Sequence, residues 1–508
     1  MPWTVEPGQG QGAKNQIMNV STDSDAKPAP SRRRRGRRIL ARILTGALLV
    51  CCIGLLIRAY FVHDSEKLLA DAEAEADRLD PGWRWEDLVA HRRVIPDEQN
   101  GAVIVMAAAK ELPAEWPPRT KQESKEPLSE LVEQLEPVVQ LNDELLAELQ
   151  AAVDAGTAAH TKLREIASRP SGRFAIELSN DFLSTKLPHM DACRGLGDLE
   201  YLAAALRAHQ GSAKAAMEHC HIFLNVGRSL TDEPFLISVV HRTLCQKRVA
   251  QSLERILGQT EVSDGDLLTM QQQLVLELQE EVLLPALRGE RVGMLRVYSS
   301  MGSGEFQSSD LRKEFDFHPF MRWTYVSWCA RYGAAQAVAM MNEAVEIGKK
   351  PLVEQRTLWR DWADSVNMQM AEAKRSSPFN ALGFVMLPAI DRIAESHFKY
   401  HALLECAVAA IAAERYRFAQ RRWPASWNEL VPKYLRVAPV DLFSDEVLRL
   451  RPLEDGMIIY SVGPDGVDNG GRIARGRDAP KKDIDVGFRL WNPVKRRQPP
   501  AKAEEKNP

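Results

Sequence analysis

The sequence lacks both a strong charge bias and the motifs that name a reaction. Its formal net charge is −3 over 508 residues, so the chain as a whole has no bulk electrostatic attraction to nucleic acid. It contains no Walker-type phosphate loop, dinucleotide-binding fingerprint, nucleophile elbow or kinase signature. We therefore expect no nucleic-acid partner, and the prior expectation of an enzyme is lowered.

Cysteine is scarce, and its spacing is not that of a disulfide framework. Two of the seven cysteines, Cys51 and Cys52, lie in an apolar run, and the other five are scattered without a CxxC pair. Most of these five are expected to be small buried residues in helices. Cys220 and Cys245 lie almost symmetrically about a turn expected near Asp232, so a disulfide between them is an alternative.

Two groups of residues have spacings that metal ligands use. The first lies on two successive predicted helices and comprises His219, Cys220, His221, His241 and Cys245. The second comprises His397, His401 and Glu405 on one helical face, but its ends are about 12 Å apart along the axis. No H-E-x-x-H motif accompanies the second group. Ordinary helix packing is the favoured interpretation of both, and a metal-dependent enzyme is an alternative.

A long uncharged run near the N-terminus predicts a membrane anchor. Residues 43–57 are bracketed by Arg42 and Arg58, and with their flanks they extend to residues 39–62. A helix of these 24 residues is about 36 Å long, enough to cross a hydrocarbon core of about 30 Å. Seven arginines between residues 32 and 42 place the N-terminus in the cytoplasm by the positive-inside rule. An uncleaved signal anchor in a bacterial inner membrane is favoured over a cleavable signal peptide.

The central part of the chain has the apolar periodicity of helices. Residues 63–395 predict an exported stack of antiparallel hairpins that loosely resembles tetratricopeptide-type proteins and uncharacterised bacterial membrane-anchored helical proteins. One long helix, or two, is expected around a perturbation at Pro137. Breaks between hairpin helices are expected at Gly211 and at residues 231–234. Another helix is expected over residues 264–288.

The pattern changes near residue 396 to a long helix, a turn, short strands and a glycine-rich loop. That loop, "YSVGPDGVDNGG" at residues 460–471, follows the short apolar run "GMIIY". With residues 416–424 and "YLRVAPVDLFSDE", these elements resemble the C-terminal part of the major pseudopilins of type II secretion systems. The resemblance implies a small α+β module at this end of the chain.

The same resemblance implies a calcium-binding loop, because many members of that family bind Ca²⁺ there. Carboxylates and backbone carbonyls on a glycine-rich turn suit a hard cation. Asp465 occupies the position of the family's loop aspartate, and Asp483 and Asp485 correspond to its later acidic pair. Asp468 and Asn469 are further local candidates.

The loop also departs from the family pattern. An arginine-rich insert separates Gly471 from Asp483, and its positive charge opposes cation capture. The family's N-terminal prepilin signature is missing, so assembly like a pilin is not expected. A purely structural hairpin loop is the favoured interpretation, and calcium binding is the first alternative. Phosphate binding is the second, although the loop lacks a Walker lysine and an evident following helix.

The sequence as a whole predicts a mainly α protein in five parts. These are a disordered basic tail, a transmembrane anchor, a helical exported domain, a long helix with the pseudopilin-like module, and a second disordered tail: residues 1–38, 39–62, 63–395, 396–493 and 494–508. We expect a non-enzymatic scaffold or protein-binding module of the cell envelope that crosses the membrane once and contacts other envelope proteins. The alternatives are an accessory component of a secretion or pilus-like machine, and the metal-dependent enzyme.

Overall fold

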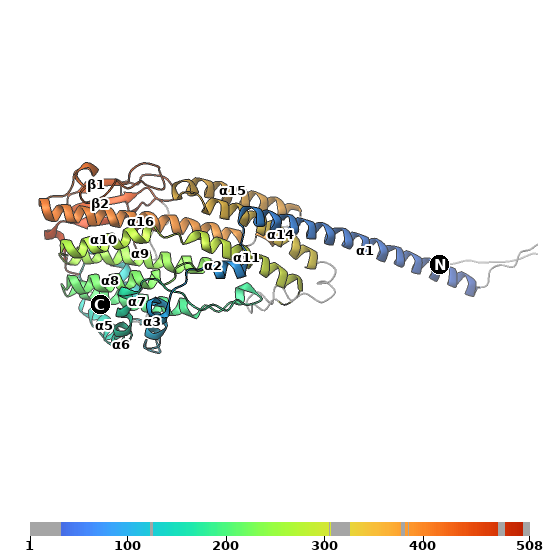
Figure 1. Cartoon of the computed structure of the whole chain (residues 1–508), viewed down its shortest axis with the longest axis horizontal. Helices are drawn as coiled ribbons and strands as arrows, with labels where there is room; N and C mark the ends of the chain where they lie inside the picture. The colour runs from blue at the N-terminus through green and yellow to red at the C-terminus, as the bar shows by residue number, and fades with distance from the viewer. Residues whose placement is uncertain are drawn as a thin grey trace, which may run out of the picture. The chain divides into compact units, whose positions relative to one another are not determined.

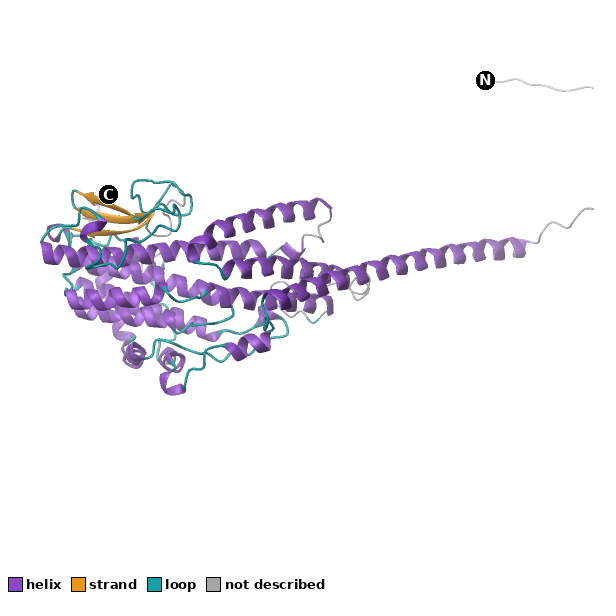
Figure 2. Ribbon diagram, turned by 45° about the horizontal axis from the view of Figure 1, so that its top comes forward, coloured by secondary structure: helices purple, strands orange, loops and turns teal. Residues whose placement is uncertain are grey.

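The computed structural model describes residues 32–121, 125–303, 305, 326–376, 382–384, 386–475 and 483–500. Within these ranges the protein is mainly helical, with one three-stranded antiparallel sheet near the C-terminus (Figures 1 and 2). The chain divides into two units, one ending at Tyr60 and the other beginning at Phe61. The two are described separately.

The first unit contains the N-terminal part of helix α1 (Arg32–Leu79). Among the described residues, α1 is the one helix that is long and apolar enough to cross a membrane. Its large apolar side chains are exposed, as expected of a helix that faces lipid: Ile39, Leu40, Ile43, Leu44, Leu48, Leu49, Val50, Ile53, Leu55, Leu56 and Ile57. The apolar helix expected over residues 39–62 is therefore present, and the helix continues unbroken to Leu79.

The second unit begins within α1 and contains all the other elements. Its longer helices are α7 (Pro188–His209), α8 (Ala213–Arg228), α9 (Leu236–Gln259), α10 (Asp264–Leu278), α11 (Leu283–Ser303), α14 (Ser327–Gly348), α15 (Leu352–Ser376) and α16 (Leu387–Gln420). Its shorter helices are α2 (Trp85–His91), α3 (Gly101–Ala109), α4 (Leu128–Gln134), α5 (Asp143–Ala155) and α6 (Thr157–Leu163). The strands are β1 (Arg449–Leu453), β2 (Gly456–Ser461) and β3 (Val486–Trp491).

Helices α7, α8 and α9 form the expected consecutive hairpins. Gly211, between α7 and α8, has φ +79°, a left-handed conformation that favours glycine at a helix end. Gly197 on α7 lets α8 approach closely, because a Cβ there would lie 2.6 Å from the Phe223 ring. Small residues thus set the spacing of this hairpin.

Two helix boundaries follow from proline. The segment around Pro137 forms two helices, α4 and α5, rather than one. The single helix expected over residues 264–288 is wrong in its extent: α10 ends at Leu278 and α11 begins at Leu283. Pro285 has no N–H to donate inside a continuous helix, but it is tolerated in the first turn of α11.

The sheet and the helical stack share one hydrophobic core. Strand β2 is central, pairing antiparallel with β1 and β3, and all of its residues are buried. Met457 and Phe488 of the sheet belong to the same buried cluster as Val249 of α9 and Ile411 of α16. Helix α16 also runs across residues 395 and 396, where a domain boundary was expected, so the two parts are joined by a continuous helix and a common core.

The chain remains packed against the body beyond β3. Arg496 is buried and pairs with Glu414 of α16, with Nη2 2.8 Å from Oε1, and its Nη1 donates to the Thr260 carbonyl over 3.1 Å. This differs from the disordered tail expected over residues 494–508. A buried guanidinium with a buried carboxylate partner holds this segment in place. Residues 501–508 lie outside the described ranges.

Candidate functional site

The glycine-rich loop is closed by the carboxylate of Asp485. This buried side chain accepts the N–H of Asn469 at Oδ1 over 3.1 Å and the N–H of Gly471 at Oδ2 over 2.7 Å. Its own N–H donates to the Arg472 carbonyl over 2.8 Å. Burial raises the pKa of Asp485 above its ordinary value. Asp485 therefore acts as an acceptor for the loop's own backbone.

Two other aspartates of the loop make similar local contacts. Asp468 Oδ1 accepts the Gly470 N–H over 2.8 Å and the Tyr460 hydroxyl over 3.1 Å. Asp465 Oδ1 accepts the Val467 N–H over 3.0 Å, two residues ahead. These are turn-type bonds in which a short side chain caps nearby backbone.

The remaining loop candidates do not converge with these carboxylates. Asn469 donates from Nδ2 to the Val467 carbonyl over 3.0 Å, and Asp483 is exposed with φ +58°. No three acidic, histidine or cysteine side chains of this loop bring ligand atoms within 4.8 Å of one another in the described chain. Hydrogen bonding thus accounts for the loop as a turn, and calcium binding stays a prediction.

Asp441, just before the sheet, holds more of this module together than any of the candidates chosen from the sequence. It is fully buried and accepts the Ser461 hydroxyl over 2.6 Å, the Val462 N–H over 3.0 Å and the Phe443 N–H over 2.9 Å. Arg449 pairs with it over 3.0 Å. Only its place in a proline-containing turn, "PVD", marked it in the sequence.

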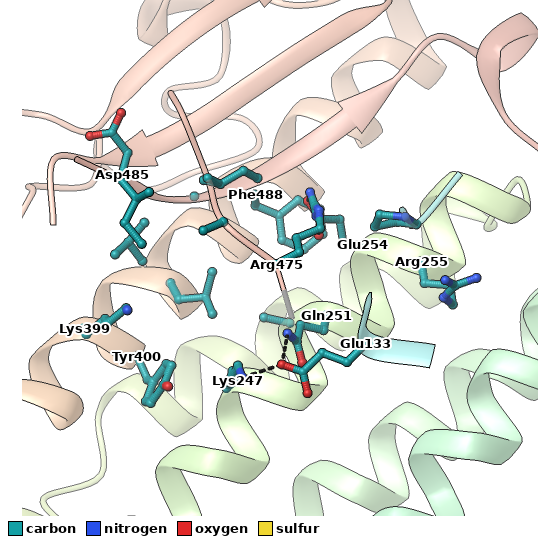
Figure 3. A pocket seen from close by; sticks show the side chains of 18 of the residues that line it. Glu133, Lys247, Gln251, Glu254, Arg255, Lys399, Tyr400, Arg475, Asp485 and Phe488 are labelled. Carbon is teal, nitrogen blue, oxygen red and sulfur yellow. Dashed lines mark hydrogen bonds and ion pairs between the residues drawn. The ribbon is translucent and has the colours of Figure 1, made fainter. Parts of the chain in front are cut away.

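A cavity of about 500 Å³ lies between the helical stack and the sheet (Figure 3). Its walls come from α4, α7, α9, α16, β3 and residues 473–475, which are far apart in the sequence. The apolar part of the lining includes Val132, Leu135, Leu403 and Phe488. No local motif marks such a site, which is why sequence reasoning missed it.

Two ion pairs line the cavity. Lys247 Nζ lies 2.6 Å from Glu133 Oε1, which Gln251 also contacts over 3.2 Å. Burial opposes ionisation of Glu133, but Lys247 holds its pKa below the ordinary value. Arg475 forms a two-pronged pair with Glu254 over 2.7 and 3.0 Å. These two pairs cancel their own charges within the cavity wall.

Two further cations of the lining have no carboxylate partner. Lys399 extends its amine into the cavity and makes no hydrogen bond or ion pair with another described residue (Figure 3). Burial, and then repulsion from Lys247, lowers its pKa. Arg255 donates only to backbone carbonyls, among them that of Val139 over 3.2 Å.

The electrostatic balance of the cavity is therefore positive. Asp485 is the one lining carboxylate outside the two ion pairs, and Figure 3 shows it turned away from Lys247 and Lys399. Its oxygens accept the backbone N–H groups of the glycine loop. Backbone carbonyls occupy Arg255, so Lys399 is the cation that faces the apolar lining, an arrangement that favours an anion with an apolar body.

The first histidine group assembles differently from its expected form. His219 of α8 lies beside His160 of α6 and Glu200 of α7, a group whose ligand-type atoms all lie within 4.8 Å of one another. It is the one such group among the described residues. Cys220 and Cys245, the expected companions of His219, are separate buried thiols with no disulfide between them. Burial raises the pKa of Cys245 to about 12.

The second group has the surroundings of packed core residues. The rings of His397 and His401 are 6.3 Å apart between centroids. Burial lowers the pKa of His397 to about 3 and that of His401 to about 4, so both are neutral at pH 7. Burial raises the pKa of Glu405 to about 7. The three do not form a ligand group, which agrees with the packing interpretation.

No protein-family profile, curated protein or solved structure matches the chain.

Proposed function

We propose that the protein is a membrane-anchored, non-enzymatic binding module of the bacterial cell envelope, and that it holds a small organic anion in the cavity between the helical stack and the sheet. The observation that carries the proposal is Lys399, a half-buried cation that faces the cavity and forms no ion pair, and whose repulsion from Lys247 outweighs its attraction to Glu395. A buried charge is costly unless an opposite charge compensates it. An anionic ligand supplies that charge.

The size and lining of the cavity define the ligand class. A volume of about 500 Å³ lies in the usual range for small-molecule sites. Lys399 offers one charged end, while Leu403 and Phe488 offer apolar contact. The ligand is accordingly a carboxylate or phosphate with an apolar body.

Anchoring and orientation rest on α1. Its exposed apolar face and length support a single membrane span, and the arginines that precede it support a cytoplasmic N-terminus by the positive-inside rule. With α1 in the inner membrane, the rest of the chain then lies outside the cytoplasm, where it can also contact other envelope proteins. A long helix followed by a turn, a small sheet and a glycine loop supports the pseudopilin-like nature of the ending.

Binding of a paired set of probes to the full chain in lipid nanodiscs tests this function. The probes are 4-phenylbutyrate and 4-phenylbutylamine, which share an apolar body and carry opposite charges. We expect saturable calorimetric binding of the carboxylate only, with a rise in melting temperature. A ligand at 100 times its Kd stabilises the folded state by about 2.7 kcal/mol.

Lys399→Met is the diagnostic variant, because it keeps an unbranched side chain of nearly the same length and removes its charge. Lys350→Met is the matched control, since Lys350 is exposed and does not line the cavity. We expect Lys399→Met to abolish carboxylate binding and Lys350→Met to leave it unchanged. Equal binding by both variants, or no preference for the carboxylate over the amine, would refute the proposal.

A further inference from the structure

Three helices bring two imidazoles onto one carboxylate away from the cavity lining. His160 of α6 places Nδ1 2.8 Å from Glu200 Oε1, and His219 of α8 places Nδ1 2.7 Å from Glu200 Oε2. The two rings lie 4.4 Å apart between centroids and are tilted by 40°. Glu200 on α7 is thus held between two potential metal ligands, one on each side.

The carboxylate has no permanent cation beside it. The Glu200 side chain has no exposed surface, and no described lysine or arginine pairs with it. Its only charge-type partners in the described chain are the two imidazoles. If both rings are neutral, a full negative charge is buried, which is unfavourable without compensation. A cation bound at this group would therefore compensate the buried negative charge of Glu200.

The group is also accessible from one side. The His160 side chain is 22% exposed, whereas that of His219 is 9% exposed. The partly exposed His160 ring is therefore the side from which an ion would enter, and movement of this ring would uncover the buried carboxylate.

We propose that His160, Glu200 and His219 bind one divalent transition-metal ion of the zinc class. Two imidazoles and one carboxylate form a known zinc donor set in which a fourth position stays open to water. Bonds of about 2.0–2.2 Å place the ligands of a tetrahedral ion about 3.3–3.6 Å apart. The observed nitrogen–oxygen distances of 2.8 and 2.7 Å need to lengthen by about 0.5–0.9 Å as the ion enters.

The donor set also selects the kind of ion. Imidazole nitrogen favours Zn²⁺, Co²⁺, Ni²⁺ and Cu²⁺ over the hard cations Ca²⁺ and Mg²⁺, which prefer oxygen. This site therefore favours a different class of ion from the Ca²⁺ that is considered for the glycine loop. A bound ion would join the short helix α6 to the α7–α8 hairpin and stabilise the folded state by binding it selectively.

The test uses the full chain without a polyhistidine tag, purified in micelles and stripped with a chelator. Co²⁺ is titrated while its visible absorption is recorded, Zn²⁺ is then added as a competitor, and elemental analysis gives the stoichiometry. We expect one Co²⁺ per chain, displaced by Zn²⁺. Absence of saturable binding would overturn the proposal and leave a hydrogen-bonded His–Glu–His group that holds only protons.

Variants identify the ligands. His160→Asn alters a partly exposed side chain and is expected to leave the fold intact by circular dichroism while weakening Co²⁺ binding more than about 100-fold, beyond the usual effect of an outer-shell change. Glu200→Gln, which keeps the side-chain shape, should do the same. The control is His221→Asn, on α8 but outside the ligand group. Co²⁺ binding that survives His160→Asn unchanged would also overturn the proposal.

Discussion

Arg291 on α11 donates from Nη2 to Asp80 Oδ2 over 2.5 Å, and the two side chains are 0% and 5% exposed. Arg288 forms a second, two-pronged pair with the same carboxylate, and Lys349 lies 3.4 Å from it. Asp80 directly follows the end of α1. One buried carboxylate thus holds the residue that follows α1 against α11 and against Lys349, which directly follows α14.

Replacing Asp80 with Asn should be strongly destabilising. The change leaves Arg291 buried without its carboxylate, and breaking a buried pair in this way costs about 3–5 kcal/mol. Chemical unfolding of the full chain in micelles, followed by tryptophan fluorescence, measures the loss. Asp71→Asn, at an exposed residue of α1, should change the free energy of unfolding by less than about 0.5 kcal/mol. Equal stability of the two variants would show that the pair is dispensable.

The raised pKa of Glu405 predicts that the folded state loses stability as the pH rises towards neutrality. Burial raises its pKa in the folded protein to about 7, whereas an unfolded glutamate titrates near about 4.3. The folded state therefore holds this proton more tightly, so the stabilising contribution is fully present below about pH 4 and is lost as the pH rises through 7.

Glu405→Gln removes this titration. We expect the variant to gain up to about 3–4 kcal/mol over the wild type at pH 8, and no advantage at pH 4. Melting temperatures of both proteins between pH 4 and pH 8 give the comparison. A constant difference across this range would mean that Glu405 does not titrate there.

Two glycines should respond in opposite ways to alanine. A Cβ at Gly289 of α11 would lie 1.9 Å from the Pro234 carbonyl oxygen, so the backbone would have to move. We expect Gly289→Ala to cost about 3 kcal/mol or more. Gly265, in the first turn of α10, has only ordinary contacts, and its change to Ala should be neutral or stabilising by up to about 1 kcal/mol. Thermal unfolding of the pair distinguishes close packing from helix propensity.

The aspartates of the glycine loop should differ in their contribution to stability, according to the hydrogen bonds that each accepts. Asp485→Ala removes the acceptor of two backbone N–H groups and should cost about 1–3 kcal/mol. Asp465→Ala removes one exposed turn bond and should cost less than about 1 kcal/mol. Added Ca²⁺ or a chelator should leave the melting temperature unchanged. Saturable heat on adding Ca²⁺, lost in Asp465→Ala, would show instead that the loop is a calcium site.

The sequence was most informative where the cause of a structure is local. Gly211 marks the α7–α8 turn because glycine tolerates its left-handed backbone, and an uncharged run marks the apolar part of α1. The expected extent of the helix that begins at residue 264 was wrong. Helical periodicity continues past Leu278, where α10 ends, and hides the restriction that Pro285 imposes. Local patterns thus predict elements better than their ends.

Contacts between distant segments were not predictable in this way. His219 was identified as a candidate ligand, but its partner Glu200 lies 19 residues away and His160 lies 40 residues before Glu200. Which side chains meet there depends on how α6, α7 and α8 pack. Lys399 gave no signal at all, because its position in the cavity lining without an ion pair becomes visible only when the cavity is assembled from separate elements.

The shared core has a consequence for how this chain must be made. Val249 and Leu253 of α9 are covered in part by the sheet, whose last strand is synthesised more than 200 residues later, and Arg489 donates its N–H to Glu254 across 235 residues. Synthesis delivers the N-terminal end first. The helical stack is therefore complete while its apolar face is still open. Closure of the body must wait until β3 has emerged, so a holding chaperone, or rapid completion of the chain, is needed in that interval.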